Sequence, residues 1–125
     1  PLDHLVKMSD ILSLHLLKTK ETEGIMTKKR VRAIKKGAII INVSPMELFD
    51  LSALLVRLKK GDITFIFDHP DEMDKKDVVK LKRYKNCIVY PPIGYVTKEA
   101  RTVKQEIFAG NIERYLSGKP ANQVN

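Results

Sequence analysis

The sequence is poor in cysteine and in long apolar runs, and each shortage excludes a class of protein. Its one cysteine, Cys87, cannot form an internal disulfide or a Cys-x-x-Cys metal site, and its three scattered histidines lack zinc-ligand spacing. All uninterrupted apolar runs are short, whereas a membrane-spanning helix needs about 20 apolar residues. We therefore expect no disulfide framework, no structural zinc site and no membrane partner.

Length and composition are those of a small globular protein. The 125 residues are 43% hydrophobic, which supports a packed core, and the length predicts a single domain over residues 1–125. The first residues do not have the charged and then apolar pattern of a secretory leader, so we expect a reducing, cytoplasmic compartment. Pro1 is compatible both with a trimmed initiator Met and with a cut inside a longer protein.

Apolar segments and helical periodicities alternate along the chain. Four short segments are too apolar on both faces for solvated strands and predict strands covered on both sides: Ile11–Leu17, Ala38–Val43, Ile63–Phe67 and Cys87–Tyr90. Cap residues and helical spacing predict helices at Asp3–Met8, Thr27–Lys36, Met46–Lys60 and Lys98–Leu116, with a further helical crossover before the last strand. This order predicts a three-layer α/β domain with about four parallel strands flanked by helices.

A series of short motifs covers nearly the whole chain. It includes DILSLHL at residues 10–16, KKGAIIIN at residues 35–42 and PPIGYVTKEA at residues 91–100. These motifs and their order resemble the D-2-hydroxyacid dehydrogenases, such as phosphoglycerate dehydrogenase. The resemblance implies an NAD-dependent oxidoreductase ancestry and a half-Rossmann fold, namely the second half of the cofactor-binding domain.

The resemblance implies NAD as cofactor, but only part of an NAD site is present. A Rossmann domain places the dinucleotide pyrophosphate on a G-x-G-x-x-G turn, and the six glycines, at positions 24, 37, 61, 94, 110 and 118, form no such motif. The residues therefore leave open whether this chain binds NAD by itself. The cofactor-binding positions that the resemblance implies are His15, Thr22, Asn42, Val43, Ser44, Asp68 and Gly94.

The family's chemistry uses an Arg to hold the substrate carboxylate, a His to transfer the proton and a Glu to keep that His protonated. Against the family pattern, Pro45 occupies the Arg position and Pro92 the His position. Met73 occupies the Glu position, and only a shift of one residue would bring Glu72 there. We therefore expect no catalytic residue of the family type and no hydride transfer by the family mechanism.

Other reactive side chains each have a structural alternative. His69 follows Asp68 at the end of a predicted strand, where open α/β sheets bind ligands, and is interpreted either as a solvated loop histidine or as a proton-transfer group. His15 is interpreted either as a buried, hydrogen-bonded histidine or as a cofactor contact. Cys87 begins a predicted strand, and we expect it to pack as a small hydrophobe.

The formal charge is +8, from 23 Lys and Arg against 15 Asp and Glu. The cations gather in residues 28–36 and 75–85, and such runs bind nucleic-acid phosphates by releasing counterions. The second run is interleaved with acids, and Tyr84 is the aromatic residue that stands among its cations, whereas single-strand readers combine cations with stacking aromatics. We therefore favour a solvated face over a nucleic-acid partner.

The resemblance also implies that the predicted strand Ile11–Leu17 loses its neighbour, because that neighbour would belong to the missing first half. The segment ILSLHLL contains no Lys and no Pro to discourage pairing at an open edge. We therefore expect the chain not to persist as a bare monomer, and to pair either with a second copy or with another chain that covers this edge.

Two functional interpretations follow. The first is a D-2-hydroxyacid dehydrogenase-like protein, or a fragment of one, in which Pro45 and Pro92 replace catalytic residues, so that enzymatic activity is left undecided. The alternative is a non-catalytic assembly or regulatory subunit that uses the same scaffold for protein contacts.

Overall fold

The computed structural model describes residues 2–94 and 96–124. The chain divides into two compact units, Pro1–Pro92 and Ile93–Asn125, and each unit is described by itself. The prediction of a single domain over residues 1–125 stays a prediction.

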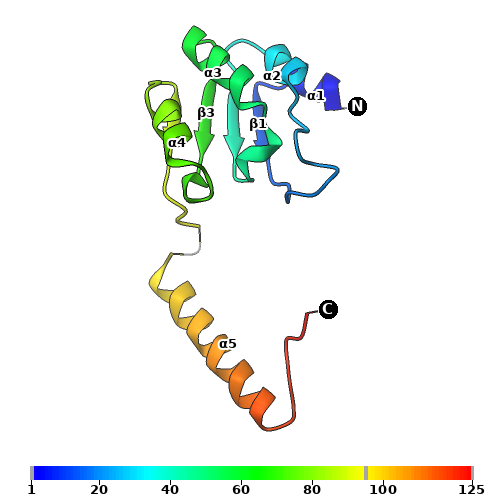
Figure 1. Cartoon of the computed structure of the whole chain (residues 1–125), viewed down its shortest axis with the longest axis vertical. Coiled ribbons are helices and arrows are strands. Elements are labelled where there is room, and N and C mark those ends of the chain that lie inside the picture. Colours follow the sequence, from blue (N-terminus) through cyan, green and yellow to red (C-terminus); the bar gives the residue numbers. More distant parts are fainter. Residues whose placement is uncertain (1, 95, 125) are drawn as a thin grey trace. The chain divides into compact units, whose positions relative to one another are not determined.

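The first unit is built on one parallel sheet (Figure 1). Its four strands lie side by side in chain order, and consecutive strands pair in register, with Ile40 beside Leu12 on one side and Phe65 on the other. The strands are β1 (Ile11–Leu14), β2 (Ile39–Asn42), β3 (Thr64–Phe67) and β4 (Cys87–Val89). Four parallel strands in one sheet flanked by helices confirm the predicted α/β, half-Rossmann fold class.

Helices connect the strands as crossovers. The helices are α1 (Leu2–Met8), α2 (Lys28–Ala33), α3 (Leu51–Lys60) and α4 (Lys75–Lys82), with short 3-10 turns η1 (Met46–Leu48) and η2 (Pro70–Glu72). Crossovers between parallel neighbours are almost always right-handed. Because the four strands follow one another in one direction across the sheet, this rule puts the crossover helices α2, α3 and α4 on the same face.

Burial alternates along the strands accordingly. Leu12, Leu14, Phe65 and Phe67 are buried on the helix-covered face, whereas Ile11 on the opposite face is 62% exposed. Within the first unit, helices cover one face of the sheet. Ile and Leu occupy both faces, which is typical of strands that a further layer covers, and cover on the second face stays a prediction.

Several element boundaries differ from the predicted ones. The predicted strand Ile11–Leu17 ends at Leu14, because beyond it the Leu16 amide donates to the Ser44 side chain and not to a strand backbone. The predicted helix Met46–Lys60 is split, because Phe49 is extended and the Asp50 carboxylate caps the start of α3. Gly61 ends α3 with a φ of 68°, a conformation that favours glycine.

The second unit contains one long helix, α5 (Lys98–Leu116), whose bounds match the prediction (Figure 1). The hydroxyl of Thr97 caps it by accepting from the Ala100 amide at 3.1 Å. None of the residues of α5 is buried. Among the described helices, none has both the length and the apolar character needed to cross a membrane.

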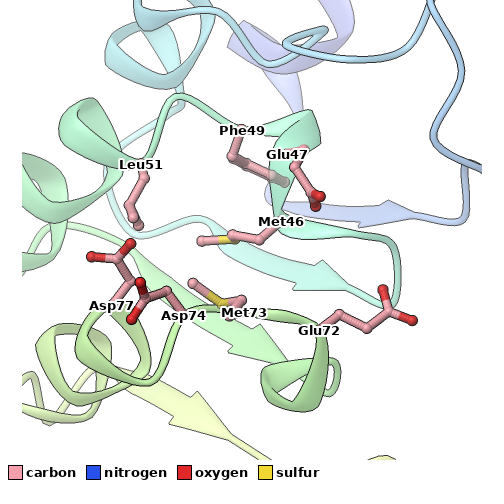
Figure 2. Close-up of a pocket in the computed structure, with 8 residues that line it drawn as sticks. All are labelled: Met46, Glu47, Phe49, Leu51, Glu72, Met73, Asp74 and Asp77. Atoms are coloured by element: carbon pink, nitrogen blue, oxygen red, sulfur yellow. The ribbon is translucent and has the colours of Figure 1, made fainter.

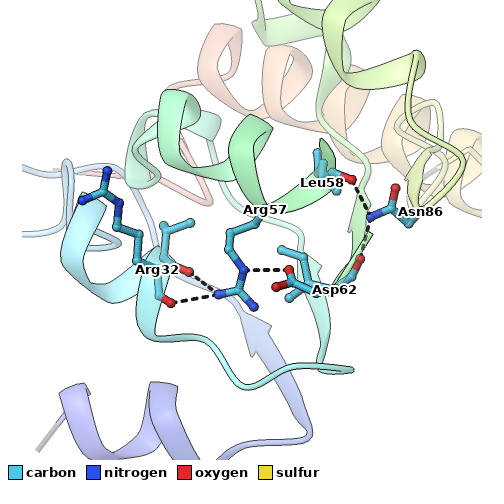
Figure 3. Close-up of polar contacts among 7 residues, drawn as sticks. Arg32, Arg57, Leu58, Asp62 and Asn86 are labelled. Atoms are coloured by element: carbon cyan, nitrogen blue, oxygen red, sulfur yellow. Dashed lines mark hydrogen bonds and ion pairs between the residues drawn. The ribbon is translucent and has the colours of Figure 1, made fainter. Parts of the chain in front are cut away.

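The buried side chain of Arg57 connects α3 to Asp62 and to the backbone of α2 (Figure 3). The Arg57 guanidinium donates to the Asp62 carboxylate at 2.8 Å and to the backbone carbonyls of Val31 and Arg32 at 2.8 and 3.1 Å. Only 4% of Arg57 is exposed, so these bonds replace its hydration. Nearby, the Asn86 amide donates to the carbonyls of Leu58 and Ile63, which fixes β4 against the α3–β3 connection.

We predict that Arg57→Met lowers the free energy of unfolding by about 3 kcal/mol or more, because it leaves the Asp62 carboxylate and two carbonyls without their donor. Urea denaturation measures the change. Arg32→Met is the matched control, because the Arg32 side chain is exposed, and it should change stability by less than about 0.5 kcal/mol. Equal effects of the two substitutions would contradict this role of Arg57.

Candidate functional site

Hydrogen bonds connect the carboxyl ends of β1 and β2. They involve Asn42, Val43 and Ser44, which are among the predicted cofactor-binding residues. The Asn42 side chain, which is fully buried, donates to the Ser44 carbonyl at 2.9 Å and accepts from the Ser44 amide at 3.2 Å. The Ser44 hydroxyl accepts from the Leu16 amide at 2.7 Å, and the Val43 amide donates to the Leu14 carbonyl. Asn42, Val43 and Ser44 therefore form a rigid turn joined to the end of β1.

His15 and Thr22 lie in the chain that follows β1; His15 is exposed and Thr22 is half-buried. Because His15 is exposed, the prediction of a buried histidine is wrong, although the ring is hydrogen-bonded, with its Nε2 2.7 Å from the Ser13 hydroxyl. Thr22 closes the following loop, because its hydroxyl donates to the Leu17 carbonyl at 2.6 Å and accepts from the Thr19 amide at 2.8 Å. This bonding gives Thr22 a structural role in the loop.

Asp68 and His69 follow β3 at the same edge of the sheet. The Asp68 Oδ1 and His69 Nδ1 atoms are buried, and neither has a hydrogen-bond partner. The His69 ring lies between two carboxylates: its Nε2 is 3.8 Å from Asp68 Oδ1, and its Nδ1 is 3.9 Å from Glu72 Oε1. The ring is about 29% exposed, so His69 is a half-buried residue rather than a fully solvated loop histidine.

A pocket of about 280 Å³ opens beside this edge (Figure 2). It lies between the segment that follows β2 and the segment that follows β3, with apolar side chains at its floor and four carboxylates among its lining. The lining residues are Met46, Glu47, Phe49, Leu51, Glu72, Met73, Asp74 and Asp77.

Neighbouring donors keep two of the pocket carboxylates charged. The Lys18 ammonium, 2.9 Å from Glu47, lowers the pKa of that carboxyl below its ordinary value. The pKa of Asp74 is lowered mainly by the Lys76 backbone amide, which donates to it at 3.0 Å as the cap of α4. Elsewhere, burial raises the pKa of the Cys87 thiol to about 11, which agrees with Cys87 as a packing residue.

Residues 1–94 match the model of the D-isomer specific 2-hydroxyacid dehydrogenase NAD-binding domain. The chain belongs to this family. It is 35% identical over 125 residues to a hydroxypyruvate reductase of Blautia hydrogenotrophica, and 36% identical over 122 residues to a glyoxylate reductase of Thermococcus litoralis. These alignments cover 99% and 97% of the chain.

A solved structure agrees with the sequence relatives. The D-lactate dehydrogenase of Lactobacillus jensenii, solved with NAD⁺, superposes with a TM-score of 0.82 at 30% identity over the whole chain. The chain covers 42% of that structure, and 39% and 37% of the two reductases. It therefore spans about two fifths of the length of its dehydrogenase relatives.

The structure brings some of the predicted dehydrogenase positions together and not others. Asn42, Val43 and Ser44 are bonded to the end of β1, next to His15, and Asp68 directly follows Phe67, the register partner of Asn42. Thr22 is bonded within its own loop. Gly94 belongs to the second unit and is described apart from the others. Cofactor binding at all seven positions stays a prediction.

The three positions that the resemblance implies as catalytic in the family lie near the carboxyl ends of the strands, and their catalytic assignment stays a prediction. Pro45 caps η1, Pro92 follows β4, and Met73 lines the pocket next to Glu72. Sequence reasoning did not find the pocket, because its apolar floor comes from segments 46–51 and 72–77, which are distant in sequence. The run of acids from Asp68 to Asp77 was the available signal, and it was interpreted as part of a solvated charged face.

We predict that Ser44→Ala lowers the free energy of unfolding by about 1 kcal/mol, because it leaves the Leu16 amide without its acceptor. Ser117→Ala removes the same hydroxyl from an exposed position in the second unit and should change stability by a few tenths of a kcal/mol at most. Urea denaturation followed by circular dichroism compares the two. A Ser44→Ala protein as stable as the unmodified chain would show that this link does not hold the edge.

Proposed function

We propose that this chain contributes the nicotinamide end of an NAD site and does not itself carry out the family's hydride transfer. Membership of the family through residues 1–94, the NAD-binding domain, supports the cofactor. The relatives include reductases named for hydroxypyruvate and glyoxylate, and these names support small 2-keto acids as the substrate class of the whole protein.

The observation that carries the proposal is the buried Asp68 Oδ1, which has no hydrogen-bond partner. An unpaired buried acceptor has a cost in free energy that a bound donor removes. The nicotinamide carboxamide offers such N–H donors, and the carboxyl ends of the strands are where open α/β sheets bind ligands. Bound NADH would supply the hydride. The chain's own part is to accept from the carboxamide at Asp68, beside the rigid turn at Asn42–Ser44.

The pyrophosphate end of NAD does not fit this chain. A dinucleotide pyrophosphate needs closely approaching backbone amides at a helix start, which a G-x-G-x-x-G turn provides. The sequence has no such turn. Another polypeptide segment has to supply that half of the site for full-strength NAD binding.

Side-chain chemistry supports the proposed lack of catalysis. Proline has no side-chain donor, so Pro45 cannot hold a carboxylate and Pro92 cannot transfer a proton. Of the three residue types that the family's chemistry uses, only the Glu has a counterpart close to its expected position, at Glu72. In this structure Glu72 Oε1 lies 3.9 Å from His69 Nδ1. A Glu without the family His and Arg does not complete the reaction.

A non-catalytic assembly or regulatory subunit is the second candidate. The observation that favours it is the apolar side chain of Ile11, which is 62% exposed on one face of the sheet. Such surfaces mark protein contacts.

Calorimetric titration with NAD tests the proposal. We expect weak but saturable binding, and at least a tenfold loss of affinity in Asp68→Ala, which removes the unpaired acceptor without breaking a hydrogen bond of the folded chain. Asp71→Ala is the control, because Asp71 is exposed in the same segment and should leave affinity unchanged. Absence of saturable heat in the unmodified chain would contradict NAD binding and favour the assembly role.

The absorbance of NADH tests the second part of the proposal, that the chain does not itself carry out hydride transfer. We expect no oxidation of NADH by the chain with hydroxypyruvate or glyoxylate. Turnover that disappears in Glu72→Gln would contradict the proposed loss of catalysis and would assign Glu72 a role in it.

A further inference from the structure

The His69 ring lies between two carboxylates without a hydrogen bond to either. Its Nε2 is 3.8 Å from Asp68 Oδ1 at the end of β3, and its Nδ1 is 3.9 Å from Glu72 Oε1 in η2. Both separations exceed the length of a hydrogen bond. Since Asp68 Oδ1 and His69 Nδ1 are buried and unpaired, each has a cost in free energy that a shift of about 1 Å toward a partner removes.

Only a protonated ring can bond to both carboxylates. A neutral imidazole has one N–H donor, whereas an imidazolium has one on each ring nitrogen. Bonds from an imidazolium to a carboxylate are also about twice as strong as bonds between neutral groups. In the part of the chain that the structure describes, neither Asp68 nor Glu72 is in an ion pair with Lys or Arg, so the charge of the His69 ring is the one that compensates them.

The turn that carries Glu72 permits this adjustment. η2 is a single 3-10 turn, and the two backbone hydrogen bonds at its end, donated by the Glu72 and Met73 amides, are both 3.4 Å long. The Glu72 side chain is 54% exposed, and Figure 2 shows it at the end of the pocket away from Asp74 and Asp77. A movement of the Glu72 carboxylate toward the ring therefore leaves those two acids in place.

Other titratable groups near this edge do not compete for the ring. Glu47 in η1 and Asp74 before α4 are each in an ion pair with a lysine, and Asp71 is exposed. Tyr90, whose backbone amide donates to the end of β3, is a phenol, which is an uncharged group at about pH 7. Among the described residues, the carboxylates within ion-pair distance of the ring are those on either side of it.

We propose that protonation of His69 joins Asp68 to Glu72 through the imidazolium ring and thereby occupies the Asp68 acceptor. Histidine changes charge between about pH 5 and 8, so this bridge forms on the acidic side of the range and opens on the basic side. The bridge stands on the geometry alone. Its consequence, that Asp68 accepts from the nicotinamide carboxamide more readily at basic pH, rests on the proposed function. His69 is then a positioning residue, because it acts on the cofactor through Asp68.

Urea denaturation of the chain without ligand tests the bridge. His69→Gln removes the group that becomes charged, so we expect it to lower the midpoint more at about pH 5.5 than at about pH 8. His4→Gln is the matched control, because His4 is exposed on α1, and it should have the same effect at both pH values. A midpoint that His69→Gln lowers equally at both pH values, or at neither, would overturn the bridge.

Calorimetric titration with NAD tests the consequence for the cofactor. We expect the unmodified chain to bind about fivefold more tightly, or better, at about pH 8 than at about pH 5.5, and His69→Gln to show less than about a twofold difference. His4→Gln should keep the pH dependence of the unmodified chain. Equal affinities of the unmodified chain at both pH values would overturn the control of Asp68 by His69. Absence of binding at both pH values, together with the expected urea midpoints, would contradict the proposed function and support the bridge.

Discussion

Parallel pairing of four strands in chain order is the constraint from which the other features of the first unit follow. It brings the carboxyl ends of β1, β2 and β3 to one edge, so that Leu16, Ser44 and Asp68 come together from distant parts of the sequence. It directs the crossover helices to one face and leaves Ile11 exposed on the other. The candidate site and the exposed face are two consequences of one topology.

The sequence predicted most of the fold because its strong signals are local. Apolar segments bounded by caps located all four strands, and the Thr97 cap with the glycine after Ser117 fixed both ends of α5. What it missed depends on tertiary contacts. The end of β1 at Leu14 follows from the bond between Leu16 and Ser44, and the break before α3 follows from Phe49, whose ring packs edge-on to Phe65 at 5.4 Å.

For the candidate site, the family resemblance identified the residues, but the hydrogen bonds that these residues make could not be predicted from it. Asn42 and Ser44 turn out to hold the edge itself, and Thr22 holds its loop, so these three have structural roles whatever they contact. Asp68 differs, because its Oδ1 is buried and unpaired. A carboxylate oxygen in that condition gains free energy when it meets a donor. Pro45 cannot hold a carboxylate, and Pro92 cannot transfer a proton. The proposed function therefore includes cofactor binding but not catalysis.

We propose that the carboxyl edge of this sheet recognises the nicotinamide end of the cofactor and not its adenine end. Amide chemical shifts of isotope-labelled protein test this most directly, with nicotinamide mononucleotide and adenosine monophosphate titrated separately. We expect the nicotinamide nucleotide to shift the amides of residues 42–44 and 68–69 and the adenine nucleotide to leave them in place. Unchanged amides with the nicotinamide nucleotide, or equal shifts with both, would contradict it.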